Sequence, residues 1–123
     1  MKIQESAETY LETILILSNS KGTVRSIDIA HELDYSKPSV SVAMKNLRES
    51  GHITVDGDGY IILTDSGRKI AETIYERHRV LSDFLKTIGV DEKTAIEDAC
   101  RIEHVISKQS FDRISEHLNL WTK

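Results

Sequence analysis

The chain has 123 residues, a formal net charge of −4 at pH 7 and one cysteine. Its length suits one domain or a small domain with an interaction extension, and its 39% hydrophobic content supports a modest core that a partner subunit often completes. The negative charge argues against a constitutive, charge-driven nucleic-acid binder, but not against a local basic patch. A lone cysteine excludes an intramolecular disulfide, and no apolar run reaches the ~20 residues of a membrane span. We therefore expect a cytoplasmic protein with no secretion signal and no membrane partner.

Hydrophobic spacing and capping residues predict a chain of six helices and one β-hairpin. Ser26 and Ser36 are placed to cap the second and third helices, and Gly51 follows the third helix as a C-cap residue. The expected helices span residues 5–17, 27–33, 37–50, 66–88, 92–107 and 111–120, and the expected strands span residues 52–56 and 60–64. The predicted fold class is mainly α with a small β-hairpin.

The order of the predicted elements indicates a winged helix. Two helices joined by only three residues form a helix-turn-helix, and a hairpin follows directly, with Gly57-Asp58-Gly59 as its turn. Three further helices come after the hairpin. Leu118, Leu120 and Trp121 look exposed near the end of the chain, which suggests a dimerisation surface in a homodimer.

The predicted recognition helix begins with hydroxyl and basic residues, at the end that enters the DNA major groove in this motif. Residues 36–55 contain three cations, Lys37, Lys45 and Arg48, against a single acid. No arginine, asparagine or glutamine precedes Asn46 in this helix, so we expect specificity from thymine-methyl contacts, phosphate positioning and DNA shape. The candidate DNA-binding residues are Ser36, Lys37, Pro38, Ser39, Ser41, Val42 and Lys45. A winged helix that serves protein contacts is the alternative.

Cys100, Glu103 and His104 lie three and four residues apart in a predicted helix, a spacing that brings a thiolate, a carboxylate and an imidazole onto one face. All three side chains bind divalent transition metals. His78 is a polar residue on the otherwise apolar inner face of the preceding helix, and three residues of the first helix can complete the shell. The candidate metal ligands are Glu8, Thr9, Glu12, His78, Cys100, Glu103 and His104. The alternative is a buried cysteine, a core histidine and solvated acids.

Five stretches of the sequence carry a family resemblance: Ala7-Glu8-Thr9-Tyr10-Leu11-Glu12, Ser36-Lys37-Pro38-Ser39-Val40, Leu63-Thr64-Asp65-Ser66-Gly67, Arg77-His78 and Cys100-Arg101-Ile102-Glu103-His104. Together they resemble the metal-dependent repressors, the family of the diphtheria toxin repressor and the manganese transport regulator. The resemblance implies a homodimeric repressor whose metal-bound form binds double-stranded operators of metal-uptake genes. It implies a winged helix-turn-helix DNA-binding domain over residues 1–70, then a helical dimerisation and metal-binding domain over residues 71–123. It also implies the short form of the family, without an SH3-like domain.

The candidate ligands mix features of the two branches of that family. The manganese branch carries Asp at the position of Thr9 and Glu at the position of Cys100, whereas the iron branch carries Met and Cys there. Cys100 is thus iron-like, while Glu12 resembles the manganese branch. Thr9 is a poor side-chain ligand, so its carbonyl, a water or Glu8 is expected to occupy that ligand position of the metal site. The resemblance therefore implies Fe(II) or Mn(II) as the cofactor, with Co(II), Ni(II) or Zn(II) able to bind in vitro.

Metal binding favours the conformation that brings the ligands together, so we expect it to fix two recognition helices at the spacing of two DNA half-sites. Two other functions fit parts of this sequence. An oxidant-sensing regulator would use Cys100 beside His104 as a low-pKa thiol, with no metal. A metallohydrolase would use Glu103 to activate a metal-bound water, but the sequence has no H-E-x-x-H motif. We therefore expect no enzyme activity and no small-molecule substrate.

Overall fold

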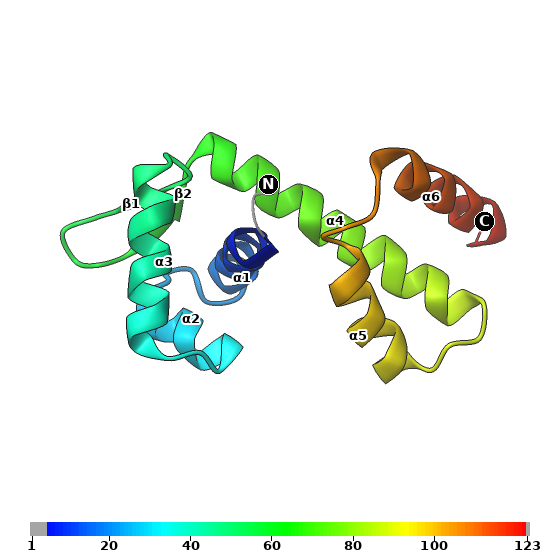
Figure 1. Cartoon of the computed structure of the whole chain (residues 1–123), viewed down its shortest axis with the longest axis horizontal. Coiled ribbons are helices and arrows are strands. Elements are labelled where there is room, and N and C mark those ends of the chain that lie inside the picture. The colour runs from blue at the N-terminus through cyan, green and yellow to red at the C-terminus, as the bar shows by residue number, and fades with distance from the viewer. Residues whose placement is uncertain (1–4, 123) are drawn as a thin grey trace. The chain divides into compact units, whose positions relative to one another are not determined.

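The structure, a computed structural model, describes residues 5–122 (Figure 1). The helices are α1 Glu5–Lys21, α2 Ser26–Leu33, α3 Lys37–Glu49, α4 Asp65–Thr87, α5 Glu92–Ile102 and α6 Lys108–Thr122, and the strands are β1 Ile53–Val55 and β2 Ile61–Leu63. The predicted fold class, mainly α with a small hairpin, is confirmed. The chain divides into two compact units, one ending at Glu72 and the other beginning at Thr73. None of the helices within residues 5–122 is both long and apolar enough to cross a lipid bilayer.

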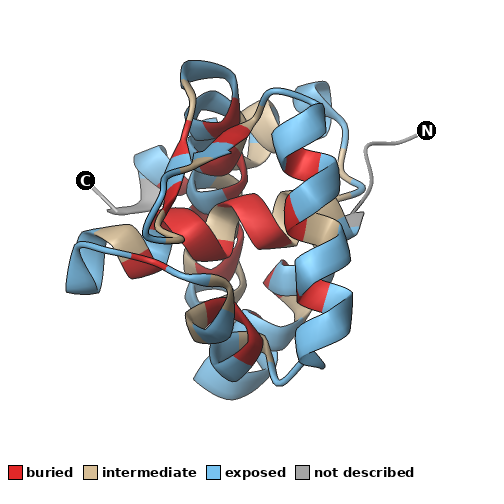
Figure 2. Cartoon of the chain, turned by 90° about the vertical axis from the view of Figure 1, so that its left-hand side faces the viewer, coloured by how far each residue is buried: buried red, intermediate tan, exposed pale blue. Residues whose placement is uncertain are grey.

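The first unit is a winged helix built around one apolar core. Leu11, Ile14, Ile29, Val40 and Ile53 are at most 1% exposed and come from α1, α2, α3 and β1. Removing side chains of this size from water stabilises a fold by roughly 1.5–3 kcal/mol each. Figure 2 shows the buried positions as stretches along helices that are otherwise exposed. The core thus holds the helix-turn-helix to both α1 and the hairpin.

The hairpin is a short antiparallel ladder. Its strands pair Ile53 with Leu63, Thr54 with Ile62 and Val55 with Ile61. Ile53, Ile61 and Leu63 are buried, whereas Thr54 and Ile62 are exposed, as expected for strands with one face on the core. Strand β2 also bonds to the segment between α1 and α2, because the backbone N–H of Ile61 donates to the carbonyl of Val24, 2.7 Å away.

Recognition helix α3 ends as the sequence predicts. Gly51 has a φ of +84°, its N–H donates to the carbonyl of Arg48, and the N–H of His52 donates to the carbonyl of Leu47. This pair of bonds is a Schellman motif, which needs a left-handed residue and therefore favours glycine. The turn directs the chain at once into β1.

Helix α2 begins one residue earlier than expected. Ser26 is its first helical residue, and Arg25 occupies the N-cap position, where its backbone N–H donates to the carboxylate of Asp28 over 2.8 Å. Ser26 was therefore wrongly assigned as the cap. The error arose because an aspartate three residues after the cap residue satisfies the cap backbone without any hydroxyl in the cap itself.

The second unit contains the rest of α4 together with α5 and α6. Helix α5 ends at Ile102 and not near Ser107 as expected, so Glu103 is its C-cap residue and His104 lies in the following turn. Leu118 was expected to be exposed but is 6% exposed, whereas Leu120 is 71% exposed. The side chain of Trp121 lies outside the described residues. An exposed apolar surface at this end of the chain therefore includes Leu120 but not Leu118.

The joint between the hairpin and α4 depends on Gly67. The hydroxyl of Thr64 donates to the carbonyl of Gly51 over 2.7 Å and accepts the backbone N–H of Gly67 over 3.2 Å, so Thr64 caps α4. A Cβ atom at Gly67 would overlap the carbonyl oxygen of His52. The first turn of α4 can approach this backbone only because residue 67 has no side chain.

We expect Gly67→Ala to destabilise the protein by about 1–3 kcal/mol, because the added methyl forces backbone atoms apart. Gly57→Ala is the matched control, since a Cβ there meets nothing within 4 Å and needs no left-handed backbone. The control should change the free energy of unfolding by less than about 0.5 kcal/mol. Urea denaturation of both variants at one protein concentration checks this, and equal effects at the two sites would contradict it.

Candidate metal centre and DNA-reading surface

A buried carboxylate between two imidazoles is the most unusual polar feature of the second unit. Glu103 is 0% exposed, and its Oε1 lies 2.8 Å from Nδ1 of His78. Its Oε2 lies 3.5 Å from Nε2 of His104, whose side chain is 5% exposed. Helix α4 supplies His78, while the C-cap of α5 and the turn after it supply the other two residues. Three side chains that bind divalent metals therefore converge within this unit.

The second oxygen of Glu103 provides a test of whether a cation fits. Within residues 5–122, no group gives Oε2 a hydrogen bond, although the atom is buried. A buried carboxylate costs several kcal/mol unless it is paired and hydrogen-bonded. His104 approaches Oε2 only at 3.5 Å. A divalent cation bound by this carboxylate and by the imidazole nitrogens would satisfy the oxygen, so the residues fit a metal.

Arg77 holds the backbone that carries this carboxylate. Its Nη1 donates to the carbonyl of Glu103 over 3.2 Å and to the carbonyl of Ile106 over 3.1 Å. Its guanidinium also lies 5.7 Å from the ring centroid of Phe111. These bonds satisfy the carbonyl of the C-cap residue of α5 and one carbonyl of the segment between α5 and α6. Sequence reasoning quoted Arg77 only as the neighbour of His78 and missed this role.

The remaining candidate ligands differ in burial. Cys100 is exposed on α5, whereas Glu103 is fully buried. The backbone of Glu103 keeps helical angles, with φ −58° and ψ −25°, and its N–H donates to the carbonyl of Ala99. Glu8, Thr9 and Glu12 are half-buried on α1, in the first unit.

All seven candidate DNA-binding residues are exposed; six lie in or just before the first two turns of α3, and Lys45 lies in its third turn. The face of α3 that turns inward carries Val40, Met44 and Leu47 instead. The hydroxyl of Ser36 accepts the backbone N–H of Ser39 over 3.3 Å and lies 2.8 Å from its hydroxyl, which confirms the expected N-cap. The exposed candidates are Ser36, Lys37, Pro38, Ser39, Ser41, Val42 and Lys45.

The start of α2 lies beside this surface, and sequence reasoning did not include it. Ser26 and Ile27 line a hollow of about 310 Å³ together with Lys37 and Ser41 of α3. Nearby, the pKa of Asp28 is held below its usual value, first by the hydrogen bond from Lys21 and then by the N–H of Arg25. A helix-turn-helix pattern alone marks the recognition helix, and the neighbouring helix start has no motif of its own.

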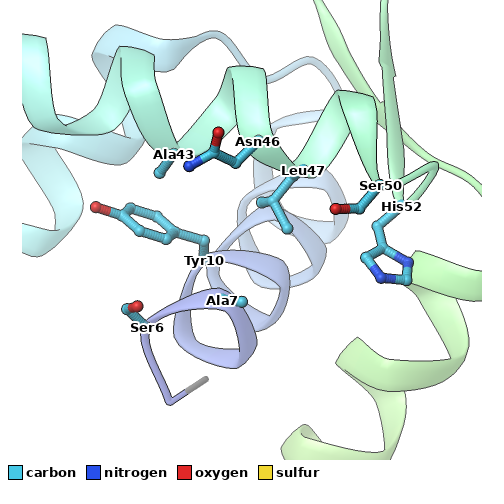
Figure 3. A pocket seen from close by; sticks show the side chains of 8 residues that line it. All are labelled: Ser6, Ala7, Tyr10, Ala43, Asn46, Leu47, Ser50 and His52. Atoms are coloured by element: carbon cyan, nitrogen blue, oxygen red, sulfur yellow. The ribbon is translucent and has the colours of Figure 1, made fainter. Parts of the chain in front are cut away.

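A second hollow, of about 270 Å³, lies between α1, α3 and the start of β1 (Figure 3). It is lined by Ser6, Ala7, Tyr10, Ala43, Asn46, Leu47, Ser50 and His52. Burial raises the pKa of the Tyr10 phenol, and the adjacent ring of Tyr35 adds to that effect. The lining contains no carboxylate and no thiol, so this hollow does not offer the donor set of the Glu103 cluster.

Comparison with known proteins assigns both parts of the chain. Residues 2–60 match the family described as iron dependent repressor, N-terminal DNA binding domain. Residues 64–122 match the family described as iron dependent repressor, metal binding and dimerisation domain. The class is therefore that of DNA-binding, metal-dependent transcriptional regulators rather than enzymes. The chain belongs to the iron-dependent repressor family.

Individual relatives support the same assignment. The chain is 38% identical over 111 residues to the HTH-type transcriptional regulator MntR of Shouchella clausii (strain KSM-K16), covering 90% of this chain and 78% of that protein. A solved structure of the manganese regulator SloR matches 97% of this chain and 55% of its own, with a TM-score of 0.82 and 28% identity. A manganese-dependent transcriptional repressor in complex with manganese matches 92% of this chain and 52% of its own, with a TM-score of 0.84 and 30% identity. The chain thus spans about half the length of these two solved relatives.

We expect Arg77→Met to destabilise the protein by about 1.5–3 kcal/mol, because two carbonyls lose a charged donor. Arg79→Met is the matched control, since the Arg79 side chain is 53% exposed and its ion pairs with Glu76 and Asp83 lie on the surface. Its effect should stay below about 0.5 kcal/mol. The measurement is urea denaturation of the metal-free proteins. Equal destabilisation by the two variants would show that the Arg77 bonds contribute nothing specific.

Proposed function

We propose that this protein is a transcriptional repressor that uses Mn(II) or Fe(II) as its co-repressor and controls genes of metal uptake and homeostasis. The observation that carries the proposal is the Glu103 carboxylate, buried against His78 and left with one oxygen unsatisfied. Such a group favours a bound cation over the metal-free state. Family membership supplies the context, since residues 64–122 match a metal-binding and dimerisation domain. The proposed place of action is the cytoplasm, where a repressor of this kind meets its operator DNA.

Mn(II) is the favoured metal. The donors gathered at the buried cluster are a carboxylate and imidazoles, and oxygen and nitrogen donors suit Mn(II). Cys100, the one soft thiol donor, is exposed on α5 instead of being buried with Glu103. Relatives of this chain are also named as manganese regulators. Fe(II) remains the second choice because imidazole and thiolate ligands also suit iron.

The proposed ligand set draws on both units. His78, Glu103 and His104 form its core in the second unit, and Cys100 is an outer candidate. From α1, the carboxylates of Glu8 and Glu12 are proposed as oxygen ligands, and Thr9 is proposed to contribute through its carbonyl or a water. A bound metal would supply the positive charge that holds these donors together. Arg77 keeps Glu103 in position for this, because its guanidinium donates a hydrogen bond to the Glu103 carbonyl.

The proposed regulation is a population shift. A ligand set shared between the two units favours the conformation in which all its donors meet. In a homodimer, this conformation sets the distance between the two recognition helices. Half-sites about one DNA turn apart, roughly 34 Å, bind only dimers with the matching distance. Metal-free protein samples other distances and therefore binds operators weakly.

The proposal is tested by DNA binding in the presence of defined metals. Operator duplexes are first selected from a random-sequence library by the wild-type protein with Mn(II), and affinity is then measured anaerobically by fluorescence anisotropy at fixed salt. We expect tight binding with Mn(II) or Fe(II) and at least a tenfold loss in EDTA. Glu103→Gln keeps the shape of the side chain but removes its charge, so it should bind DNA in Mn(II) no better than wild type does in EDTA.

Glu97→Gln is the matched control for that variant, because Glu97 is exposed on α5, the helix that Glu103 caps, and it should retain the full metal response. Thermal unfolding gives a readout independent of DNA. Mn(II) at 100 times its Kd should stabilise wild type and Glu97→Gln by about 2.7 kcal/mol but not Glu103→Gln. DNA binding that persists in EDTA and disappears under peroxide would instead favour an oxidant sensor based on Cys100.

The role of α3 in backbone contacts makes a separate prediction. Lys37→Ala and Lys45→Ala should each weaken binding to operator and random DNA by similar factors, because a lysine–phosphate contact carries no sequence information. Each should also reduce the slope of log K against log[salt] by about 0.9 per protomer. Lys93→Ala, an exposed lysine on α5, is the control and should leave the slope unchanged. The idea fails if all three variants behave alike.

A further inference from the structure

The hairpin of this winged helix is acidic, which is unexpected for an element that stands beside a DNA-reading helix. Residues 51–64 include Asp56 and Asp58 but no lysine or arginine. Both aspartates are in the turn between β1 and β2, and both are exposed. Figure 1 shows this turn projecting beyond α3 at the far edge of the first unit. Its charge is thus opposite to that of Lys37 and Lys45 on α3.

The carboxylates are held at the tip by a defined turn. Oδ1 of Asp56 accepts the backbone N–H of Asp58 over 2.9 Å and that of Tyr60 over 3.0 Å. The N–H of Gly59, whose φ is +85°, donates to the carbonyl of Asp56 over 3.0 Å. Asp56 therefore shapes the turn through its side chain, whereas Asp58 takes part through its backbone. Substitution of the Asp58 side chain leaves these bonds in place.

A cation packs against the hairpin beside its turn. The guanidinium of Arg25 lies 4.6 Å from the ring centroid of Tyr60, the residue whose N–H donates to the carboxylate of Asp56. This cation offsets part of the charge of the two aspartates, but their carboxylates remain exposed in the turn. DNA carries one negative charge per about 1.7 Å of its axis, so phosphates repel these exposed carboxylates.

We propose that the Asp56–Asp58 tip is a specificity-determining element that keeps the wing off the DNA phosphates. With the tip repelled, the wing adds no sequence-independent affinity, and recognition depends on α3 and the helix starts beside it. Like-charge juxtaposition is a general way to suppress wrong binding modes. The inference rests on the DNA-binding role of the family and not on the identity of the metal.

The consequence for regulation is a low background of binding. Non-specific DNA affinity comes almost entirely from phosphate contacts, and a genome offers a very large number of competing sites. A wing that repels phosphates lowers this affinity for metal-free and metal-bound protein alike. The metal-dependent difference at the operator is then not hidden by sequence-independent binding.

The test replaces the side chain of Asp58. Asp58→Asn and Asp58→Lys are compared with wild type on a random-sequence 30-base-pair duplex, with Mn(II) and with EDTA, between 50 and 300 mM salt. We expect Asp58→Lys to bind this duplex about tenfold more tightly than wild type and Asp58→Asn about threefold. The slope of log K against log[salt] should steepen by about 0.9 per protomer for the lysine variant. Its preference for the selected operator over random DNA should fall.

Glu97→Lys makes the same change in net charge on an exposed position of α5 and is the matched control. Circular dichroism and thermal unfolding verify that each variant is folded. The inference is overturned if Asp58→Lys binds random DNA no more tightly than wild type, or if Glu97→Lys has the same effect. Because the EDTA arm involves no metal, failure of the metal-responsive function and failure of this inference give different results.

Discussion

The buried carboxylate of Glu103 is the constraint on which the second unit depends. A fully buried charge is stable only when its neighbours compensate it, and here His78, His104 and the Arg77-supported backbone are arranged around a single side chain. The compensation is incomplete at Oε2. A fold that tolerates such a group places function ahead of stability at that point, which is typical of binding sites. The matched family is described as a metal-binding and dimerisation domain, and a metal-binding role accounts for a buried carboxylate that lowers the stability of the metal-free fold.

Much of the first unit could be predicted from sequence because its signals are local. Ser36 caps α3, Gly51 ends it, and Gly57-Asp58-Gly59 marks the hairpin turn, and each of these depends on a few neighbouring residues. The errors have equally local causes. Arg25, whose N–H donates to the carboxylate of Asp28, takes the N-cap of α2 in place of Ser26, and apolar spacing alone could not distinguish the buried Leu118 from the exposed Leu120. Resemblance to a family then supplied the order and meaning of the elements.

The site was harder to predict than the fold because spacing along a helix does not say how deeply each side chain is buried. Helical spacing grouped Cys100 with Glu103, yet the thiol is exposed and the carboxylate is fully buried. His78 stood out as a polar residue on an apolar helix face, but its 2.8 Å contact with Oε1 of Glu103 could not be read from the spacing. Arg77 was missed as a support because its partners are backbone carbonyls, and carbonyls leave no trace in the identity of residues.

The joint at Gly67 also has a mechanical meaning. The carbonyl of His52, the hydroxyls of Thr64 and Ser66 and the bare backbone of Gly67 meet at one point, and the His52 ring adds a 3.0 Å contact to Ser66. These contacts leave no space for the first turn of α4 to slide along the start of the hairpin, so we expect the two segments to move as one rigid piece. A rotation of that turn would then rotate the winged helix with it.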